Sequence, residues 1–229
     1  MAENFVIPII CGPTGSGKTA AALELADQFE IEIISADSRQ IIRHLDIGTA
    51  KPTSEEQAKA NFHLIDIIEP GERYSAFRFI DDCEKAISKI LDRDHVPLIV
   101  GGTGLYLKAL TDGVVEIESD DMKIRSRLEN ELEEQGAEAL YARLESIDPL
   151  EAVRIHPHNK IRVLRALEIF YLTGKTKSEL ATTGAYKKSE RSFAYFCLAP
   201  ERQNLYSGIE SRVDQMMEQG LLEEVKDLL

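Results

Sequence analysis

The 229-residue chain has little of what marks membrane-spanning, secreted or disulfide-stabilised proteins. No run approaches the roughly 18 apolar residues of a transmembrane helix, and the N-terminal stretch MAENFVIPIICG has neither a basic segment nor a small-residue cleavage site. Its three cysteines, Cys11, Cys83 and Cys197, are too few and too scattered for a disulfide framework or a zinc site. These absences predict a cytoplasmic protein with no membrane partner.

Positive charge is also scarce, because 27 Lys and Arg face 40 Asp and Glu, and the formal net charge is −13. Taken over the whole chain, this balance argues against a nucleic-acid partner. The charge is uneven, however: residues 154–191 carry nine basic and three acidic side chains, so this window is +6 and the remainder −19. A compact basic region can hold a polyanion while the rest of the surface repels it, so the charge distribution keeps a nucleic-acid partner open.

Short apolar runs alternate with helical patterns over the first 112 residues. Strands are expected at 5–10, 31–35, 62–68 and 96–100, and helices at 19–29 and 74–93. This alternation is typical of right-handed βαβ units, and it predicts an α/β fold with a parallel sheet flanked by helices.

After residue 112 the strand pattern stops and charged helical patterns follow. They cover residues 122–135, 137–147 and 159–173. A strand is next expected at 192–199, with its aromatic residues and Cys197 in the core, and a helix interrupted at Gly220 follows it. We therefore expect an α/β core over 1–112, a helical insertion subdomain over 113–190, and a return to the core over 191–229.

A phosphate-binding loop stands between the first strand and the first helix. The segment matches G-x-x-x-x-G-K-[ST] with Gly12, Pro13, Thr14, Gly15, Ser16, Gly17, Lys18 and Thr19. Backbone N–H groups of such a loop surround phosphate oxygens, while Lys18 supplies charge and Thr19 can bind Mg²⁺. The motif predicts a P-loop NTPase-like fold and a di- or triphosphate ligand, and does not say which ligand.

Two further residues follow expected strands, at the sheet end where ligands bind in parallel sheets. Asp37 comes after the second strand and is a candidate Mg²⁺ ligand, general base or helix N-cap. Thr103 follows the strand at 96–100 and either contacts a ligand or only starts the next helix.

Eight motifs in order carry a family resemblance. They are GPTGSGKT (12–19), SADSRQI (35–41), DIGTAKP (46–52), IVGGTGLYLKAL (99–110), VRIHP (153–157), RVLRALEIF (162–170), TGKTKSEL (173–180) and QGLLEEVKDLL (219–229). Together they resemble the tRNA dimethylallyltransferase family over essentially the whole chain. Members of that family usually continue with a basic terminal helix, so this chain is expected to lack the C-terminal segment.

The resemblance implies prenyl transfer from dimethylallyl diphosphate to N6 of the adenosine 3′ to the anticodon in tRNA, by a monomer that uses Mg²⁺. It implies that Asp37 accepts the proton of the attacking amine, with Lys18 and Thr103 as further catalytic residues. The phosphate loop and Arg212 would bind the diphosphate. The implied contacts with the tRNA anticodon stem-loop are Asp37, Ser38, Arg39, Gln40, Thr103, Arg125, Ile161, Arg162, Val163, Leu164 and Arg165.

Three alternatives remain open at this point. A small-molecule P-loop kinase would explain the phosphate loop but not DIGTAKP. An adenylate isopentenyltransferase would keep the donor site and use a free nucleotide as acceptor. An RNA-binding scaffold with a vestigial loop is disfavoured, because Lys18, Thr19 and Asp37 are intact.

Overall fold

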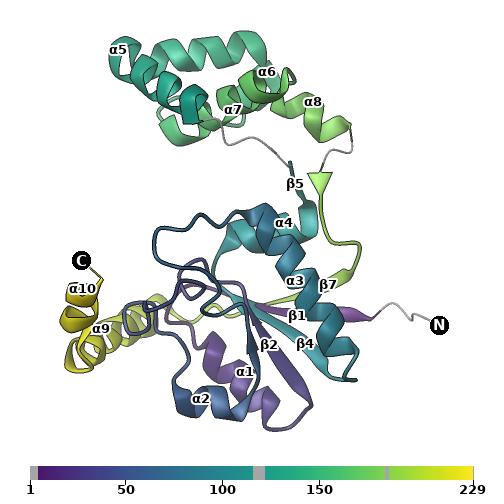
Figure 1. Cartoon of the computed structure of the whole chain (residues 1–229), viewed down its shortest axis with the longest axis vertical. Helices are drawn as coiled ribbons and strands as arrows, with labels where there is room; N and C mark the ends of the chain where they lie inside the picture. Colours follow the sequence, from purple (N-terminus) through teal and green to yellow (C-terminus); the bar gives the residue numbers. More distant parts are fainter. Residues whose placement is uncertain (1–4, 116–121, 184–185, 229) are drawn as a thin grey trace. The chain divides into compact units, whose positions relative to one another are not determined.

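The computed structural model describes residues 5–115, 122–183 and 186–228 (Figure 1). The chain divides into two compact units. Unit 1 comprises Met1–Asp112 and Lys188–Leu229, and unit 2 comprises Gly113–Lys187. The divisions expected from the sequence, after residues 112 and 190, lie at or close to these bounds.

Unit 1 is built on a five-stranded sheet in the order β3-β2-β4-β1-β7. The strands are β1 (Val6–Cys11), β2 (Ile31–Ser35), β3 (Phe62–His63), β4 (Val96–Gly101) and β7 (Ser192–Cys197). Every pairing in this sheet is parallel, as the alternation of strands and helices predicts. The third strand is much shorter than expected, because only two residues of the stretch 62–68 pair with β2.

Helices cover both faces of this sheet (Figure 1). The helices of unit 1 are α1 (Lys18–Ala26), α2 (Ser54–Lys59), α3 (Ala76–Leu91), α4 (Gly104–Asp112), α9 (Arg202–Glu218) and α10 (Leu221–Asp227). Of these, α1 and α3 lie on opposite faces of the sheet, and α9 and α10 extend away from it (Figure 1). Ile33 and Leu98 pack with Leu23 of α1 on one face. Since side chains alternate along a strand, the buried Ile34 and Ile99 point to the opposite face, where α3 lies.

The strand register brings the carboxyl ends of three strands together. Cys11 at the end of β1 lies beside Gly101 at the end of β4, and Ser35 at the end of β2 lies beside Val100. The loops that follow β1, β2 and β4 therefore leave the same end of the sheet, and these loops contain the predicted site.

Strand β7 corrects one expectation about the core. Tyr195 and Phe196 are 47% and 57% exposed, and Cys197 is exposed as well. The sequence predicts a core strand from their apolar character, but β7 is the edge strand of the sheet and pairs with β1 alone. The same pairing sets Cys11 Sγ 2.7 Å from Cys197 Sγ, so two cysteines far apart in the sequence are neighbours.

Unit 2 is mainly helical. It contains α5 (Met122–Ile147), α6 (Pro149–Ala152), α7 (Lys160–Thr173) and α8 (Lys177–Thr182). Gly136 has φ 83° and ψ 167°, so it breaks α5 where the sequence predicts a helix end. Leu140, Leu144 and Leu167 are fully buried in the core of this unit.

A short antiparallel pair, β5 (Val114–Val115) and β6 (Tyr186–Lys187), joins the two ends of unit 2. The sequence predicts no strand between the one at 96–100 and the one at 192–199, because two residues are too few to show a period. Among all the described helices, none is both long and apolar enough to cross a membrane.

Candidate active site at the carboxyl end of the sheet

The phosphate loop connects β1 to α1, as the motif predicts. A side chain at Gly12 would place its Cβ 2.5 Å from the carbonyl oxygen of Leu198, so only glycine allows this approach to the segment after β7. Helix α1 begins at Lys18, directly after the loop. The free N–H groups of its first turn therefore face the space that the loop encloses.

Lys18 lies over the phosphate loop. Its Nζ donates hydrogen bonds to the carbonyl oxygens of Gly12 (3.1 Å) and Pro13 (2.7 Å). Burial lowers the pKa of Lys18, Asp37 opposes this shift, and Arg212 adds to it. The charges of Asp37 and Arg212 are therefore close enough to act on the ammonium group, although the three residues come from three separate segments.

Thr19 and Ser16 supply oxygen atoms that could serve an anion or a hard cation. Thr19, Lys18 and Asp37 line a cavity of about 40 Å³. Ser16 Oγ is buried and has no hydrogen-bond partner among the described residues. Because Mg²⁺ takes one or two protein oxygens together with phosphate and water, this donor set fits a magnesium–diphosphate complex.

The carboxylate of Asp37 caps the turn after β2. Its Oδ1 accepts a hydrogen bond from the backbone N–H of Arg39 (2.8 Å) and a longer one from that of Gln40 (3.4 Å). Its Oδ2 has no hydrogen bond to the described residues. One oxygen thus serves as the cap, and the other stays available for a metal or a proton.

Thr103 and Gly101 hold this turn from the neighbouring strand end. Thr103 Oγ1 accepts a hydrogen bond from the backbone N–H of Ser38 (2.9 Å), and Thr103 N–H donates to the carbonyl of Ala36 (3.2 Å). A Cβ at Gly101 would lie 2.1 Å from that same carbonyl oxygen, so the position requires glycine. The structure therefore places Thr103 as a support for the segment that carries Asp37.

The side chains of Arg39 and Gln40 differ in their freedom to bind RNA. Arg39 is exposed, and none of the described residues pairs with its guanidinium. Both ends of the Gln40 amide are engaged, since Oε1 accepts from Ser35 Oγ (3.0 Å) and Nε2 donates to Ala50 O (3.1 Å).

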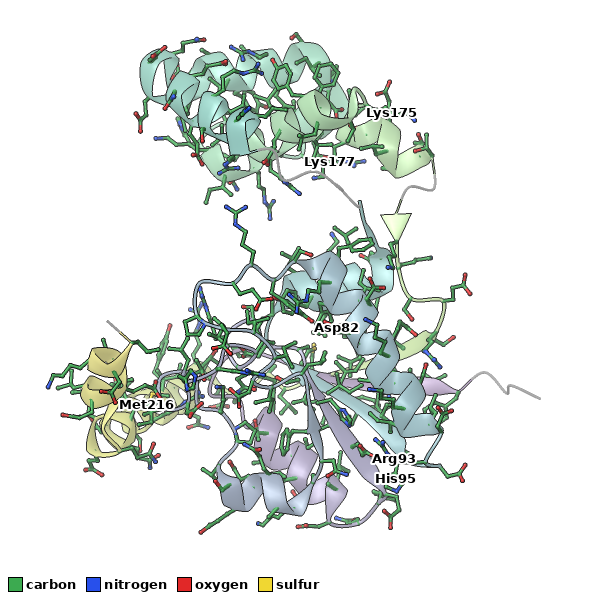
Figure 2. The ribbon with its side chains drawn as sticks, viewed as in Figure 1. Asp82, Arg93, His95, Lys175, Lys177 and Met216 are labelled. Atoms are coloured by element: carbon green, nitrogen blue, oxygen red, sulfur yellow. The ribbon has the colours of Figure 1, made fainter. Side chains whose placement is uncertain are left out.

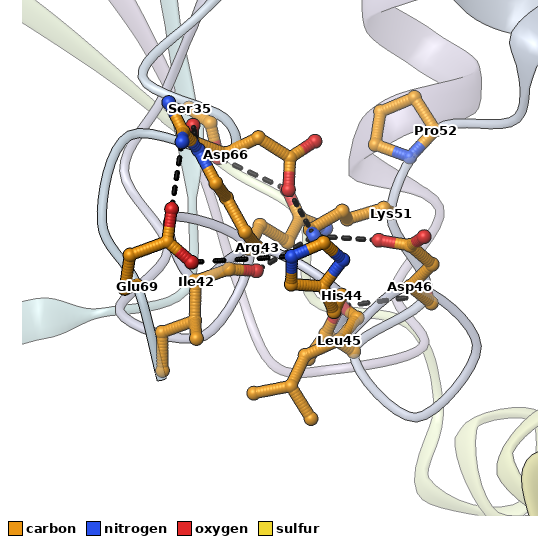
Figure 3. Close-up of polar contacts among 12 residues, drawn as sticks. Ser35, Ile42, Arg43, His44, Leu45, Asp46, Lys51, Pro52, Asp66 and Glu69 are labelled. Carbon is orange, nitrogen blue, oxygen red and sulfur yellow. Dashed lines mark hydrogen bonds and ion pairs between the residues drawn. The ribbon is translucent and has the colours of Figure 1, made fainter. Parts of the chain in front are cut away.

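A buried cation holds the DIGTAKP segment in place (Figure 3). The side chain of Lys51 is only 3% exposed, and its Nζ bonds to the carbonyl of Ile42 (2.7 Å), Asp46 Oδ1 (2.6 Å) and Asp66. Two carboxylates and a carbonyl satisfy the ammonium, which offsets the cost of burying its charge. The sequence analysis missed this role, because an isolated lysine is most often a surface residue.

In unit 2 the predicted RNA contacts separate into exposed and buried residues. Ile161 is 74% exposed, and Arg162 and Arg165 are also on the surface of α7. Val163 and Leu164 are 2% and 3% exposed and belong to the core. The resemblance implies direct RNA contacts for both, but their side chains lie inside the core, because consecutive residues of one helix cannot all face outward.

Arg125 and Arg165 meet at one carboxylate of unit 2. Glu168 is buried, and its Oε2 lies 2.8 Å from Arg165 Nη1 and 3.7 Å from Arg125 Nη1. Arg125 also pairs with Glu129 at 2.6 Å. Arg125 therefore presents less free charge than the sequence suggests, whereas Arg162 has no ion pair with the described residues.

Comparison with known proteins decides the family. The model described as IPP transferase matches residues 40–229, and the one described as isopentenyl transferase matches residues 5–67. A tRNA dimethylallyltransferase of Desulfotalea psychrophila is 47% identical over 223 residues, which cover 96% of this chain and 70% of that protein. The chain belongs to the tRNA dimethylallyltransferase family.

Solved structures agree with this membership. The tRNA isopentenylpyrophosphate transferase of Bacillus halodurans is 41% identical with a TM-score of 0.64, over 97% of this chain and 69% of that one. A eukaryotic dimethylallyltransferase, described as acting on tRNA, is 33% identical with a TM-score of 0.80, over 97% of this chain and 55% of that one. The P-loop NTPase-like fold predicted from the sequence is thus confirmed.

Tyr106 of α4, the helix that begins directly after Thr103, is a buried aromatic residue. Its ring stacks on Phe79 with centroids 4.6 Å apart, and only 4% of the residue is exposed. Burial raises the pKa of Tyr106, and the nearby charge of Asp37 adds to this effect. In the sequence, Tyr106 is one of several apolar residues of a helical pattern, and nothing distinguishes it from the other buried residues of α4.

Proposed function

We propose that this protein transfers a dimethylallyl group from dimethylallyl diphosphate to N6 of the adenosine 3′ to the anticodon in tRNA and releases diphosphate. The observation that carries the proposal is the position of Asp37. Its carboxylate lines the same small cavity as Lys18 and Thr19 of the phosphate loop. A proton acceptor thus stands beside a diphosphate site, in a chain of the dimethylallyltransferase family.

On the donor side, the loop backbone, Lys18 and Arg212 bind the diphosphate, and Thr19 holds Mg²⁺. When bound, Mg²⁺ neutralises negative charge on the diphosphate oxygens. Lys18 and Arg212 stabilise the charge that develops on the leaving oxygen as the allylic C–O bond breaks. Ile33 and Phe62 give part of the cavity wall an apolar surface beside these charges.

On the acceptor side, the adenine must leave its stack for N6 to reach the allylic carbon. As the new C–N bond forms, Asp37 accepts a proton from N6 through Oδ2. Thr103 keeps Asp37 in position through Ser38 and Ala36, and acts as a positioning residue.

The remaining RNA contacts are proposed for exposed cations. Arg39 in unit 1 and Arg162 and Arg165 in unit 2 bind phosphates, with Arg125 as a weaker contact. Ser38 and the backbone of Gln40 in unit 1, and Ile161 in unit 2, are proposed as further contacts. Val163 and Leu164 position Arg162 and Arg165 by packing in the core of unit 2.

One assay tests the proposed function. The protein is incubated with radiolabelled dimethylallyl diphosphate and Mg²⁺, and with either tRNA or AMP as acceptor. We expect label in tRNA at the adenosine 3′ to the anticodon. Label in AMP alone would assign the chain to the free-nucleotide enzymes, and phosphorylation of a small acceptor at the expense of ATP would make it a kinase.

A further inference from the structure

The two C-terminal helices, α9 and α10, bury little surface against the rest of unit 1. None of the described side chains of α9 or α10 is buried. Four half-buried residues, Leu205, Ile209, Arg212 and Met216, are spaced four, three and four positions apart and so share one face of α9. On α10, Leu221 and Glu224 share a face in the same way. The contacts made by these two faces fix the positions of α9 and α10 in unit 1.

The face of α9 rests on the phosphate loop. A Cβ at Gly15 would lie 3.0 Å from Ile209 Cγ1 and 3.6 Å from Leu205 Cδ1, so the helix lies directly against the loop. Arg212 follows Ile209 by one turn, and its charge acts on Lys18. Because this contact buries little apolar surface, it cannot by itself fix the position of Arg212.

The face of α10 is held by a carboxylate in a backbone cradle. Glu224 Oε2 accepts hydrogen bonds from the N–H groups of Asp46 (2.8 Å) and Ile47 (2.6 Å), and Oε1 accepts one from that of Gly48 (3.0 Å). A Cβ at Gly48 would lie 3.1 Å from Leu221 Cδ1, so a larger residue would press against α10. Three successive N–H groups on one carboxylate form a strong, charge-assisted anion site.

The cradle is built independently of the helix that occupies it. Lys51 Nζ fixes the side chain of Asp46 and also holds the carbonyl of Ile42 (Figure 3). The N–H groups of residues 46–48 are therefore already oriented before Glu224 contacts them. Forming the contact then costs little conformational entropy.

We propose that Glu224 is a positioning residue for diphosphate binding: it anchors α10 on residues 46–48 and thereby holds Arg212 of α9 beside Lys18. This inference rests on the proposed function for the identity of the ligand of Arg212. Binding of the diphosphate donor then depends on the carboxylate of Glu224, which does not contact the donor.

The test measures binding of inorganic diphosphate with Mg²⁺ by calorimetry, using Glu224→Gln, Arg212→Ala and the double variant. An amide in the cradle sets an NH₂ group against a backbone N–H, so Glu224→Gln should weaken diphosphate binding about tenfold. Arg212→Ala should weaken it at least as much. If Glu224 acts through Arg212, the double variant binds no more weakly than Arg212→Ala.

Glu223→Gln is the matched control, because Glu223 is on the same helix turn and its one ion pair with the described residues is an exposed contact with Lys226 (3.8 Å). It should bind diphosphate like the parent chain. Hydrogen exchange over residues 202–227 should speed up in Glu224→Gln and not in Glu223→Gln.

Unchanged diphosphate binding by Glu224→Gln would overturn the inference, and so would additive losses in the double variant. Failure of the proposed function gives a different result: diphosphate binding and its dependence on Glu224 persist, but no label from dimethylallyl diphosphate enters tRNA.

Discussion

Asp37 has one structural task, and we propose a chemical one for the same side chain. Its Oδ1 caps the turn after β2 through Arg39 N–H, and its Oδ2 is left for chemistry. The sequence places an acid at the end of a strand but cannot separate a cap from a base, because both tasks select the same residue type. The hydrogen bonds are compatible with both tasks, because they engage Oδ1 only.

Two substitutions separate these tasks. Asp37→Asn keeps an oxygen for the cap and removes the base, so prenyl transfer to tRNA should fall about 10²- to 10⁴-fold while diphosphate binding stays near normal. Asp37→Ala also removes the cap and should cost about 1 kcal/mol more in unfolding free energy. Single-turnover assays and calorimetry measure the first effect, and urea unfolding the second. Equal loss of transfer and donor binding in Asp37→Asn would instead make Asp37 a metal ligand.

Among single residues, those that belong to a sequence motif can be predicted from the sequence. Those that act through contacts with distant segments of the chain cannot. Lys18 belongs to the phosphate-loop motif, and Asp37 and Thr103 each follow a predicted strand, so a local pattern points to all three. None points to Lys51 or Glu224, since their contacts join segments that no local pattern connects; Glu224 is 178 residues from Asp46.

Among the elements, β2 carries a polar group at each end, with different consequences. Near its start, Glu32 is 1% exposed and accepts hydrogen bonds from Arg93 Nε (2.8 Å) and Nη2 (2.7 Å). It also bonds to His63 Nε2 (2.7 Å) and His95 Nδ1 (2.9 Å). Arg93 and His95 lie together at the end of the sheet opposite the phosphate loop (Figure 2). This cluster ties β2 to its neighbours and takes no part in the proposed chemistry.

The cluster makes stability depend on pH. Burial raises the pKa of Glu32, but its bonds to Arg93, His63 and His95 outweigh this and lower it to about 2. Because the folded pKa is depressed, the stabilisation is complete above the unfolded pKa and is lost as pH falls toward 2. Glu32→Gln should cost about 3 kcal/mol in unfolding free energy at pH 7, and the deficit should shrink below pH 4.5.

Urea unfolding at several pH values measures this deficit. Glu30→Gln is the control, since Glu30 has a side chain that is 85% exposed and lies 3.6 Å from the same His95. It should change stability little at any pH. A Glu32→Gln deficit that stayed constant down to pH 2 would contradict the assignment.

The elements themselves were predicted where the pattern is long. The amphipathic helix expected at 74–93 is observed as α3, which begins after its N-cap Ser75 and ends at Leu91. Prediction failed for β5 and β6, which are too short, and for the burial of β7. An apolar strand pattern indicates a strand but not whether a neighbour covers it, so Phe196 could not be placed from sequence.

In the whole molecule, the overall charge of −13 hides a basic window in and beside unit 2. Part of that charge is neutralised within the unit, as in the pairs of Arg165 with Glu168 and Lys177 with Glu151. Fewer unpaired cations therefore remain for phosphate contacts in unit 2, so we expect tRNA binding to depend only weakly on salt.

Arg162→Ala tests this expectation. Since the guanidinium is exposed and has no ion pair with the described residues, its removal should weaken tRNA binding for all sequences and reduce the slope of log K against log salt by about 1. Filter binding between low and high salt gives the slope. Lys85→Ala, on α3 with an exposed ammonium, should leave the slope unchanged. An unaltered slope in Arg162→Ala would remove α7 from the RNA-binding surface.

The pairing of β1 with β7 has a consequence for how the chain assembles. Register partners Cys11 and Cys197 are 186 residues apart, and all of unit 2 is synthesised between them. Unit 2 is one continuous segment, so it can complete its own core while β1 still exposes an unpaired edge. Closing so long a loop is slow, and an open strand edge invites pairing with other chains. Arrival of β7 at the edge of β1 is therefore the step at which we expect folding and aggregation to compete.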